Sequence, residues 1–178
     1  MKKLNVLLKF SAFLLVVVLM ASCEKGEDPI VNSPETETQT IKNWLAAMKV
    51  KKNHVDSVVT NNTTSFYYIK LDSIGTGDLV TTGDSVTVIY TGMFVDGSIF
   101  DTSETTDSRP DTYAYVHKDT NPEKRMISGW EAGMEILKKG EKYAFLFPSK
   151  LAYGAMGHSR VIPPYTPLIF VIEVTDVK

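Results

Sequence analysis

The stretch Tyr153-Gly154-Ala155-Met156-Gly157-His158, closed by Val161-Ile162-Pro163-Pro164, is the segment of this 178-residue chain that decides the fold. Two prolines at its end restrict the backbone, because the proline ring fixes φ. Glycines within it mark turns rather than a regular helix or strand. The stretch therefore predicts a rigid aromatic loop.

Three upstream segments accompany this loop. They are Tyr90-Thr91-Gly92, Gly97-Ser98-Ile99-Phe100-Asp101 and Ile127-Ser128-Gly129-Trp130-Glu131. Together and in this order, the four segments resemble the FKBP-type peptidyl-prolyl cis/trans isomerases over roughly residues 75–178. The resemblance implies an α+β fold, in which a twisted antiparallel β-sheet wraps around one short α-helix. It also implies catalysed rotation about X-Pro peptide bonds and help with protein folding.

The resemblance implies a role for individual residues. The rings of Tyr90, Phe100 and Phe170 would line the pocket, with Trp130 as its floor, while Asp101 would orient the site through Tyr90 or a nearby basic group. The Ile127 N–H and the Tyr153 hydroxyl would bind substrate carbonyl groups. The implied catalytic residues are Tyr90, Phe100, Asp101, Tyr153 and Phe170, and the implied substrate-binding residues are Tyr113, Met126, Ile127, Trp130, His158, Val161 and Ile162.

The sequence predicts neither a metal site nor a cofactor. The chain has three histidines, and His158 lacks a cysteine or acidic partner at ligand spacing. The implied reaction makes and breaks no covalent bond, so it needs no cofactor. His158 is therefore interpreted as a loop residue.

Two other functions remain open at this level. The fold could serve as a tethered binding module or chaperone without turnover, and aromatics such as Tyr90 could be ordinary core residues. An unrelated all-β lipoprotein that binds glycans or a partner protein is the second alternative.

The chain also departs from the family pattern in longer stretches at 102–112 and 117–125 and in Met126, which replaces a β-branched residue. These departures affect the expected binding of particular X-Pro sequences and of macrolide inhibitors.

The amino terminus has the pattern of a bacterial lipoprotein signal peptide over residues 1–22. Three lysines precede an apolar run from Phe10 to Met20, and small residues then lead to Cys23, the only cysteine. A membrane-spanning helix needs about 20 apolar residues, and this run is shorter. We expect cleavage and lipidation at Cys23, and hence anchoring in the bacterial cell envelope, at the periplasmic or surface face of the outer membrane. A plain secretory signal with an incidental thiol is the alternative.

Removal of residues 1–22 would change the formal net charge from −2 to −5, because this segment carries three lysines and no acidic residue. A chain of this charge offers no basic patch for nucleic acid. The expected partners are instead the membrane, through the lipid, and proline-containing unfolded or nascent envelope proteins.

Residues 23–39 are rich in Glu, Thr, Pro and Ser, which predicts a flexible tether. Within residues 40–64 we expect a helix that ends near Lys52, because Ile41, Trp44, Leu45 and Met48 form one apolar stripe. The stripe could dock on its own domain or form a dimer contact. The shortness of the helix favours a monomer. Its distance in sequence from the four motifs predicts that it is dispensable for chemistry.

Residues 65–178 are predicted to form the isomerase domain. Alternating apolar residues predict strands over 65–72, 85–91, 143–147 and 168–174, with one face buried and one wetter. One helix interrupts these strands. Ser128 and Glu131 have capping-box spacing. Three residues, Trp130, Met134 and Leu137, share one helix face, and Gly140 is placed to end the helix in a left-handed cap.

Overall fold

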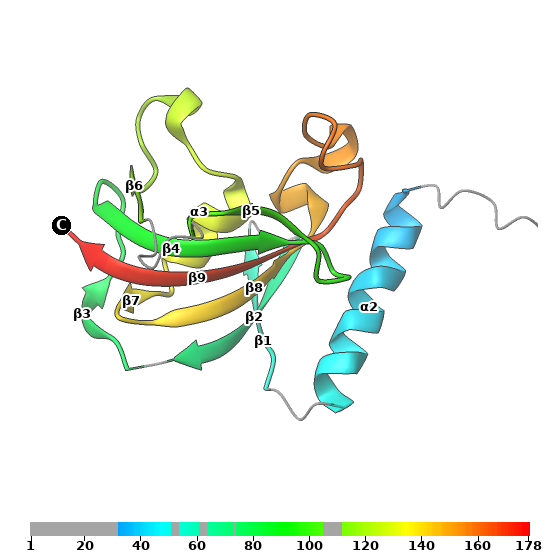
Figure 1. The fold of residues 1–178 in the computed structure, drawn as a ribbon, viewed down its shortest axis with the longest axis horizontal. Coiled ribbons are helices and arrows are strands. Elements are labelled where there is room, and N and C mark those ends of the chain that lie inside the picture. Colours follow the sequence, from blue (N-terminus) through cyan, green and yellow to red (C-terminus); the bar gives the residue numbers. More distant parts are fainter. Residues whose placement is uncertain (1–31, 51–53, 61–63, 73, 105–111) are drawn as a thin grey trace, which may run out of the picture. The chain divides into compact units, whose positions relative to one another are not determined.

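The computed structural model describes residues 32–50, 54–60, 64–72, 74–104 and 112–178 (Figure 1). The predicted signal peptide and Cys23 lie outside these residues. In the described part, no helix has the length and apolar character needed to cross a membrane.

The helices are α2 (Pro34–Val50) and α3 (Ser128–Met134), with 3-10 turns η2 (Pro122–Lys124), η3 (Ser149–Leu151) and η4 (Gly154–Met156). The strands are β1 (Asp56–Thr60), β2 (Thr64–Asp72), β3 (Thr76–Leu79), β4 (Ser85–Met93), β5 (Ile99–Thr102), β6 (Tyr113–Val116), β7 (Lys138–Lys139), β8 (Lys142–Phe147) and β9 (Leu168–Val177).

Seven strands of the described residues form one antiparallel sheet in the order β1-β2-β8-β9-β4-β5, with β6 also paired to β4. Strands β3 and β7 form a separate pair. The longest pairing joins β4 and β9, from Val86 opposite Val177 to Met93 opposite Ile169. The short helix α3 packs against one face of the curved sheet (Figure 1). The predicted α+β architecture is therefore confirmed.

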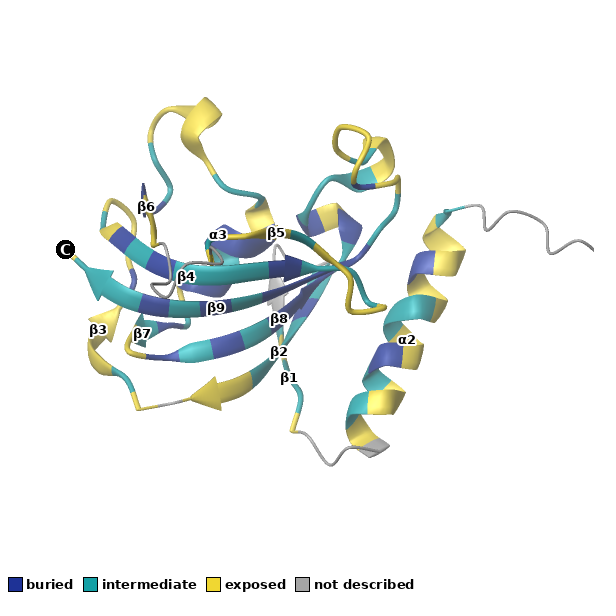
Figure 2. Cartoon of the chain, viewed as in Figure 1, coloured by how far each residue is buried: buried dark blue, intermediate teal, exposed yellow. Residues whose placement is uncertain are grey.

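The alternation of side chains along β8 and β9 buries one set of residues on the α3 side of the sheet. This set contains Tyr143, Phe145, Phe147, Leu168, Phe170, Ile172 and Val174. Figure 2 shows the resulting alternation of buried and partly exposed positions along β9. The opposite face was expected to be wetter, but Leu146 and Ile169 are buried there against Trp44 of α2. The apolar stripe of α2 thus docks on the sheet of its own chain.

The start of α2 corrects the predicted tether. The helix begins at Pro34, inside the segment 23–39, rather than near Thr40. The Thr36 hydroxyl accepts the Ser33 N–H at 2.8 Å, and the Ser33 hydroxyl accepts the Thr36 N–H at 3.3 Å, which is a reciprocal cap. Proline at the first helical position and acidic residues in the first turn also favour this start. The predicted start near Thr40 was based on apolar periodicity, which does not include these polar capping residues.

The predicted capping box of α3 is wrong. Ser128 is already helical, so Ile127 is the N-cap, and its apolar side chain makes no cap bond. The Glu131 carboxylate accepts backbone N–H groups from Lys118 at 3.0 Å and Met126 at 3.1 Å instead. These donors belong to the preceding loop, so a tertiary interaction replaces the local cap.

The predicted end of α3 at Gly140 is also wrong. The helix ends at Met134, and the Leu137 N–H bonds back to the Met134 carbonyl at 3.0 Å in a tighter turn. Gly140 does have a left-handed φ of +88°, but it lies in the turn between β7 and β8. Its N–H donates to the Val174 carbonyl at 2.7 Å. The predicted apolar face is confirmed, since Trp130, Met134 and Leu137 are all buried.

Candidate active site

Four aromatic rings from different elements meet on the α3 side of the sheet. Tyr90 comes from β4, Phe100 from β5, Phe170 from β9 and Trp130 from α3. The Trp130 indole is fully buried, and its ring centroid lies 5.2 Å from that of Tyr90 and 5.4 Å from that of Phe170, with interplanar angles of 88° and 86°. Phe100 and Phe170 are 5.6 Å apart at 86°. Edge-to-face contacts of this kind fix the orientation of the rings.

Gly92 allows two of these rings to approach the backbone of β4. A Cβ atom at this position would lie 2.7 Å from the Phe100 ring and 2.9 Å from the Phe170 ring. A side chain would therefore push the rings apart. Gly92 was predicted as part of the Tyr90 motif, and the structure gives the steric reason for the glycine.

Phe94 is a further aromatic neighbour that the sequence argument missed. Its ring centroid lies 5.2 Å from that of Phe100. The signal was available, because Tyr90, Gly92 and Phe94 are spaced by two residues and so lie on one face of the extended chain. Phe94 thus extends the cluster beyond Phe100.

Asp101 orients Tyr90. The Tyr90 hydroxyl donates to Asp101 Oδ2 at 2.8 Å. The backbone at Tyr90 is also held, because its N–H donates to Ser103 Oγ at 2.9 Å and its carbonyl accepts the Ser103 N–H at 3.0 Å. Burial, followed by the hydrogen bond to Asp101, raises the pKa of Tyr90 well above its usual range. Tyr90 therefore stays protonated at neutral pH.

The loop quoted at the outset has a defined geometry. The rings of Tyr153 and His158 stack with centroids 4.5 Å apart. His158 and Ile162 exchange backbone hydrogen bonds of 2.8 and 3.0 Å, which close the loop. Gly157 has a φ of +65°, and a Cβ atom there would lie 2.2 Å from the Ile162 carbonyl oxygen. No other residue type fits this position without a backbone shift.

The loop residues differ in exposure. Ile162 is buried, whereas Val161 is 54% exposed. Burial, with a contribution from the charge of Asp101, raises the pKa of Tyr153. The Tyr153 hydroxyl is thus a neutral hydrogen-bond donor at physiological pH.

The predicted rim residues lie next to the ring cluster. The Tyr113 ring is 6.0 Å from that of Tyr90 at 77°, and its hydroxyl donates to the Met126 sulfur at 3.9 Å. Ile127 is partly buried and packs on the same core as Trp130. The structure therefore brings Tyr113 and Met126 together beside Tyr90, and Ile127 next to Trp130.

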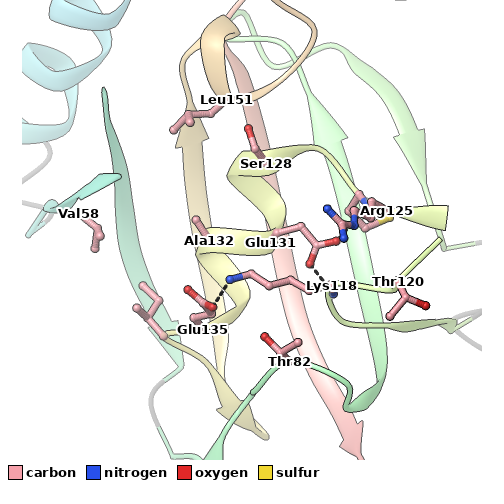
Figure 3. Close-up of a pocket in the computed structure, with 12 residues that line it drawn as sticks. Val58, Thr82, Lys118, Thr120, Arg125, Ser128, Glu131, Ala132, Glu135 and Leu151 are labelled. Carbon is pink, nitrogen blue, oxygen red and sulfur yellow. Dashed lines mark hydrogen bonds and ion pairs between the residues drawn. The ribbon is translucent and has the colours of Figure 1, made fainter. Parts of the chain in front are cut away.

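A separate groove of about 770 Å³ runs beside α3 (Figure 3). Of the predicted site residues, Met126 lines it. Figure 3 shows Glu131 bonded to the Lys118 backbone, while the Lys118 ammonium pairs with Glu135. Glu131 thus ties both ends of the 118–126 loop to the helix.

His117 lies behind this loop and is fully buried. Its Nδ1 is 2.8 Å from Glu131 Oε2. Burial lowers the pKa of His117, against the opposing effect of the Glu131 and Glu135 carboxylates. The sequence argument had no local signal for this cluster, because 14 positions separate the two partners.

Among the described residues, no group of three or more His, Cys, Asp or Glu side chains could hold a metal ion. The ring cluster itself offers apolar ring edges and the hydroxyl groups of Tyr90 and Tyr153.

The family model of FKBP-type peptidyl-prolyl cis-trans isomerases matches residues 77–175. The chain belongs to this family. It is 36% identical over 109 residues to a probable FKBP-type peptidyl-prolyl cis-trans isomerase of Haemophilus influenzae, across 61% of this chain and 42% of that protein. It is also 36% identical over 113 residues to FK506-binding protein 1 of Saccharomyces cerevisiae, across 62% of this chain and 93% of that protein.

A crystal structure of a peptidyl-prolyl cis-trans isomerase from Pseudomonas syringae matches with a TM-score of 0.62 and 29% identity, across 86% of this chain and 99% of the other. The match to this chain covers less than half of the H. influenzae protein but most of the yeast protein.

Proposed function

We propose that this chain is an active peptidyl-prolyl isomerase whose substrate pocket is lined by Tyr90, Phe100, Trp130 and Phe170. The observation that carries the proposal is the edge-to-face arrangement of these four rings on one side of the sheet. Membership of the FKBP family supports the same activity.

The mechanism rests on removing the substrate amide from water. Rotation about an X-Pro bond has a barrier of roughly 18–20 kcal/mol, because resonance gives the C–N bond double-bond character. The twisted amide has less charge separation than the planar amide, so an apolar site favours it. Each tenfold of rate requires about 1.4 kcal/mol of such differential stabilisation.

Hydrogen bonds orient the substrate in this proposal. The Tyr153 hydroxyl and the Ile127 N–H donate to substrate carbonyl groups, while Asp101 keeps the Tyr90 hydroxyl turned away from the ring edges that face the amide. Met126, Tyr113, His158, Val161 and Ile162 form the walls that the residues flanking proline contact. Because both tyrosine pKa values are raised, these hydroxyl groups remain neutral donors over the physiological range.

Turnover of a short X-Pro peptide by a soluble fragment that begins at Asn32 tests the activity. This start keeps the Ser33 cap of α2. Turnover that falls strongly in Phe100→Ala supports the proposal. A folded wild-type fragment that binds unfolded chains without turnover would support the chaperone alternative, and a folded fragment that does neither would contradict the proposed activity.

We also propose that the protein is anchored in the bacterial envelope through lipid on Cys23 and acts there on proline-containing unfolded or nascent proteins. The pattern of residues 1–22 supports this location. Cys23→Ala should abolish incorporation of a labelled fatty acid. Equal labelling of the wild-type and variant proteins would exclude this anchor.

The FKBP-type site is further proposed to bind macrolide inhibitors, and the protein is proposed to be a monomer. Docking of Trp44 on Leu146 and Ile169 within the chain supports the monomer, because it covers the apolar stripe of α2. Sedimentation at micromolar concentration and inhibition of turnover by a macrolide test these two points.

A further inference from the structure

Glu37 of α2 is a buried carboxylate that contacts the turn preceding the Tyr153 loop. Glu37 is 9% exposed. The Ser149 hydroxyl donates to Glu37 Oε2 at 2.7 Å, and the Ser149 backbone N–H donates to Oε1. The N-terminal half of α2 therefore lies beside η3 (Figure 1). A buried carboxylate is costly unless it is hydrogen-bonded, so this contact is specific in its geometry.

Ser149 begins the tight turn that leads into the Tyr153 loop. The Leu151 N–H donates to the Pro148 carbonyl and the Ala152 N–H donates to the Ser149 carbonyl, both at 2.8 Å. Tyr153 follows directly. A displacement of Ser149 is thus transmitted over a short, hydrogen-bonded segment to the Tyr153 ring.

The same turn also packs against the start of α3. A Cβ atom at Gly129 would lie 3.0 Å from the Leu151 carbonyl oxygen and 2.7 Å from the Phe147 ring. Gly129 directly precedes Trp130. The turn η3 therefore lies between Glu37 on one side and the backbone of the proposed pocket floor on the other.

The remainder of α2 cannot set this position by itself. Trp44 contacts the sheet through apolar side chains, and such contacts are not directional. Two hydrogen bonds to one carboxylate do fix the position of Ser149. If position 37 had no carboxylate, α2 could still pack on the sheet, but it would not hold Ser149 by hydrogen bonds.

We infer that Glu37 is a positioning residue for the isomerase reaction, which acts through Ser149 and η3 to place the Tyr153 hydroxyl. The inference rests on the proposed function. It also revises the expectation that the helix is dispensable for chemistry, because that expectation used distance in sequence rather than in space.

The first test compares Glu37→Ala with Glu35→Ala in the full chain purified in detergent. Glu35 is in the same helical turn but is exposed, so it controls for loss of charge on α2. At a temperature where both variants are folded, Glu37→Ala should lower kcat/KM about 3- to 10-fold through kcat, since misplacement of a catalytic group slows the reaction. Glu37→Gln, which keeps one acceptor oxygen, should recover part of the rate. Equal rates for Glu37→Ala and the wild type would overturn the inference.

The second test distinguishes positioning from a general loss of stability. In the Tyr153→Phe background, Glu37→Ala should have a smaller effect on kcat than in the wild type, because its target hydroxyl is already absent. Fully additive losses would contradict action through Tyr153.

The third test does not depend on turnover. Hydrogen exchange at the Ser149 and Ala152 amides should be faster in Glu37→Ala and unchanged in Glu35→Ala. If the wild-type protein shows no turnover, the proposed function fails, and the exchange result alone decides whether Glu37 holds this turn. Unchanged exchange in Glu37→Ala would refute the inference.

Discussion

The two faces of the large sheet differ in how many aromatic rings they bury. On the α3 face, aromatic rings pack edge-to-face around Trp130. On the α2 face, Trp44 packs on the aliphatic residues Leu146 and Ile169. Adjacent residues supply both faces, since Phe145 and Phe170 belong to the first and Leu146 and Ile169 to the second.

The difference between the faces shows how packing and positioning can be separated. Aromatic edges have a preferred geometry, so the α3 face both buries surface and orients its rings. Aliphatic burial has no preferred direction. The α2 face obtains its directional contact from a buried carboxylate, that of Glu37 on Ser149.

Substitution of the tryptophan on each face should break this comparison most strongly. Trp130→Ala should lower the free energy of unfolding by about 3–5 kcal/mol and abolish turnover, because it removes the proposed pocket floor and leaves a cavity. Trp44→Ala should also lower the free energy of unfolding but retain most turnover at low temperature, since Glu37 still holds η3. Urea unfolding and peptide turnover measure the two effects. Loss of turnover in folded Trp44→Ala protein would show that the two faces are not separable in this way.

Phe100→Ala tests the aromatic face without disturbing its buried centre. Phe100 is partly exposed, so we expect a small stability loss but a decrease in kcat/KM of about 10- to 100-fold, because water enters the proposed pocket. Ile99→Ala is the matched control, since Ile99 is 62% exposed and adjacent in β5. Unchanged turnover in Phe100→Ala would show that the pocket argument is wrong.

Two hydrogen-bonding residues should give smaller effects. Tyr153→Phe removes one hydrogen bond, worth about 0.5–1.5 kcal/mol, and keeps the ring, so kcat/KM should fall about 2- to 12-fold. Asp101→Ala should cost more, because it releases the Tyr90 hydroxyl from its 2.8 Å hydrogen bond and so frees a ring of the cluster. A larger loss in Tyr153→Phe than in Asp101→Ala would reverse the proposed roles.

The smallest expected effect concerns pH. The pKa of His117 is lowered from 6.5 in the folded protein, so the unfolded chain binds more protons as pH falls through 6.5. The free energy of unfolding should therefore decrease as pH drops below about 6.5, until the folded-state pKa is passed. His117→Leu should reduce this dependence, measured by urea unfolding between pH 7.5 and 4.5 with wild type as reference. The same slope in both proteins would show that His117 does not cause the dependence.

Turnover itself should be almost constant between about pH 6 and 8 and insensitive to chelators, because the hydroxyl groups of Tyr90 and Tyr153 have raised pKa values and stay protonated. A steep profile with one titrating group would indicate acid or base catalysis instead.

The amino-acid sequence by itself determined the family, the four motifs and the strands β2, β4, β8 and β9, whereas β1, β3, β5, β6 and β7 were not predicted. Strand alternation is a local property with a period of two, so β8 and β9 could be located from their own residues. The four motifs that carry Tyr90, Phe100, Trp130 and Tyr153 were each recognisable within a few positions. Phe94 followed the same alternation and could have been included.

Only the tertiary structure decided which partners the buried carboxylates bind. Glu131 had the spacing of a helix cap, yet it binds the Lys118 N–H, 13 positions away. Glu37 fell within a predicted tether, yet it binds Ser149, 112 positions away. A carboxylate side chain can accept hydrogen bonds from any donor that folding brings within reach, and local sequence carries no record of that donor. The location of these two residues therefore required the three-dimensional packing of α2 and α3 on the sheet.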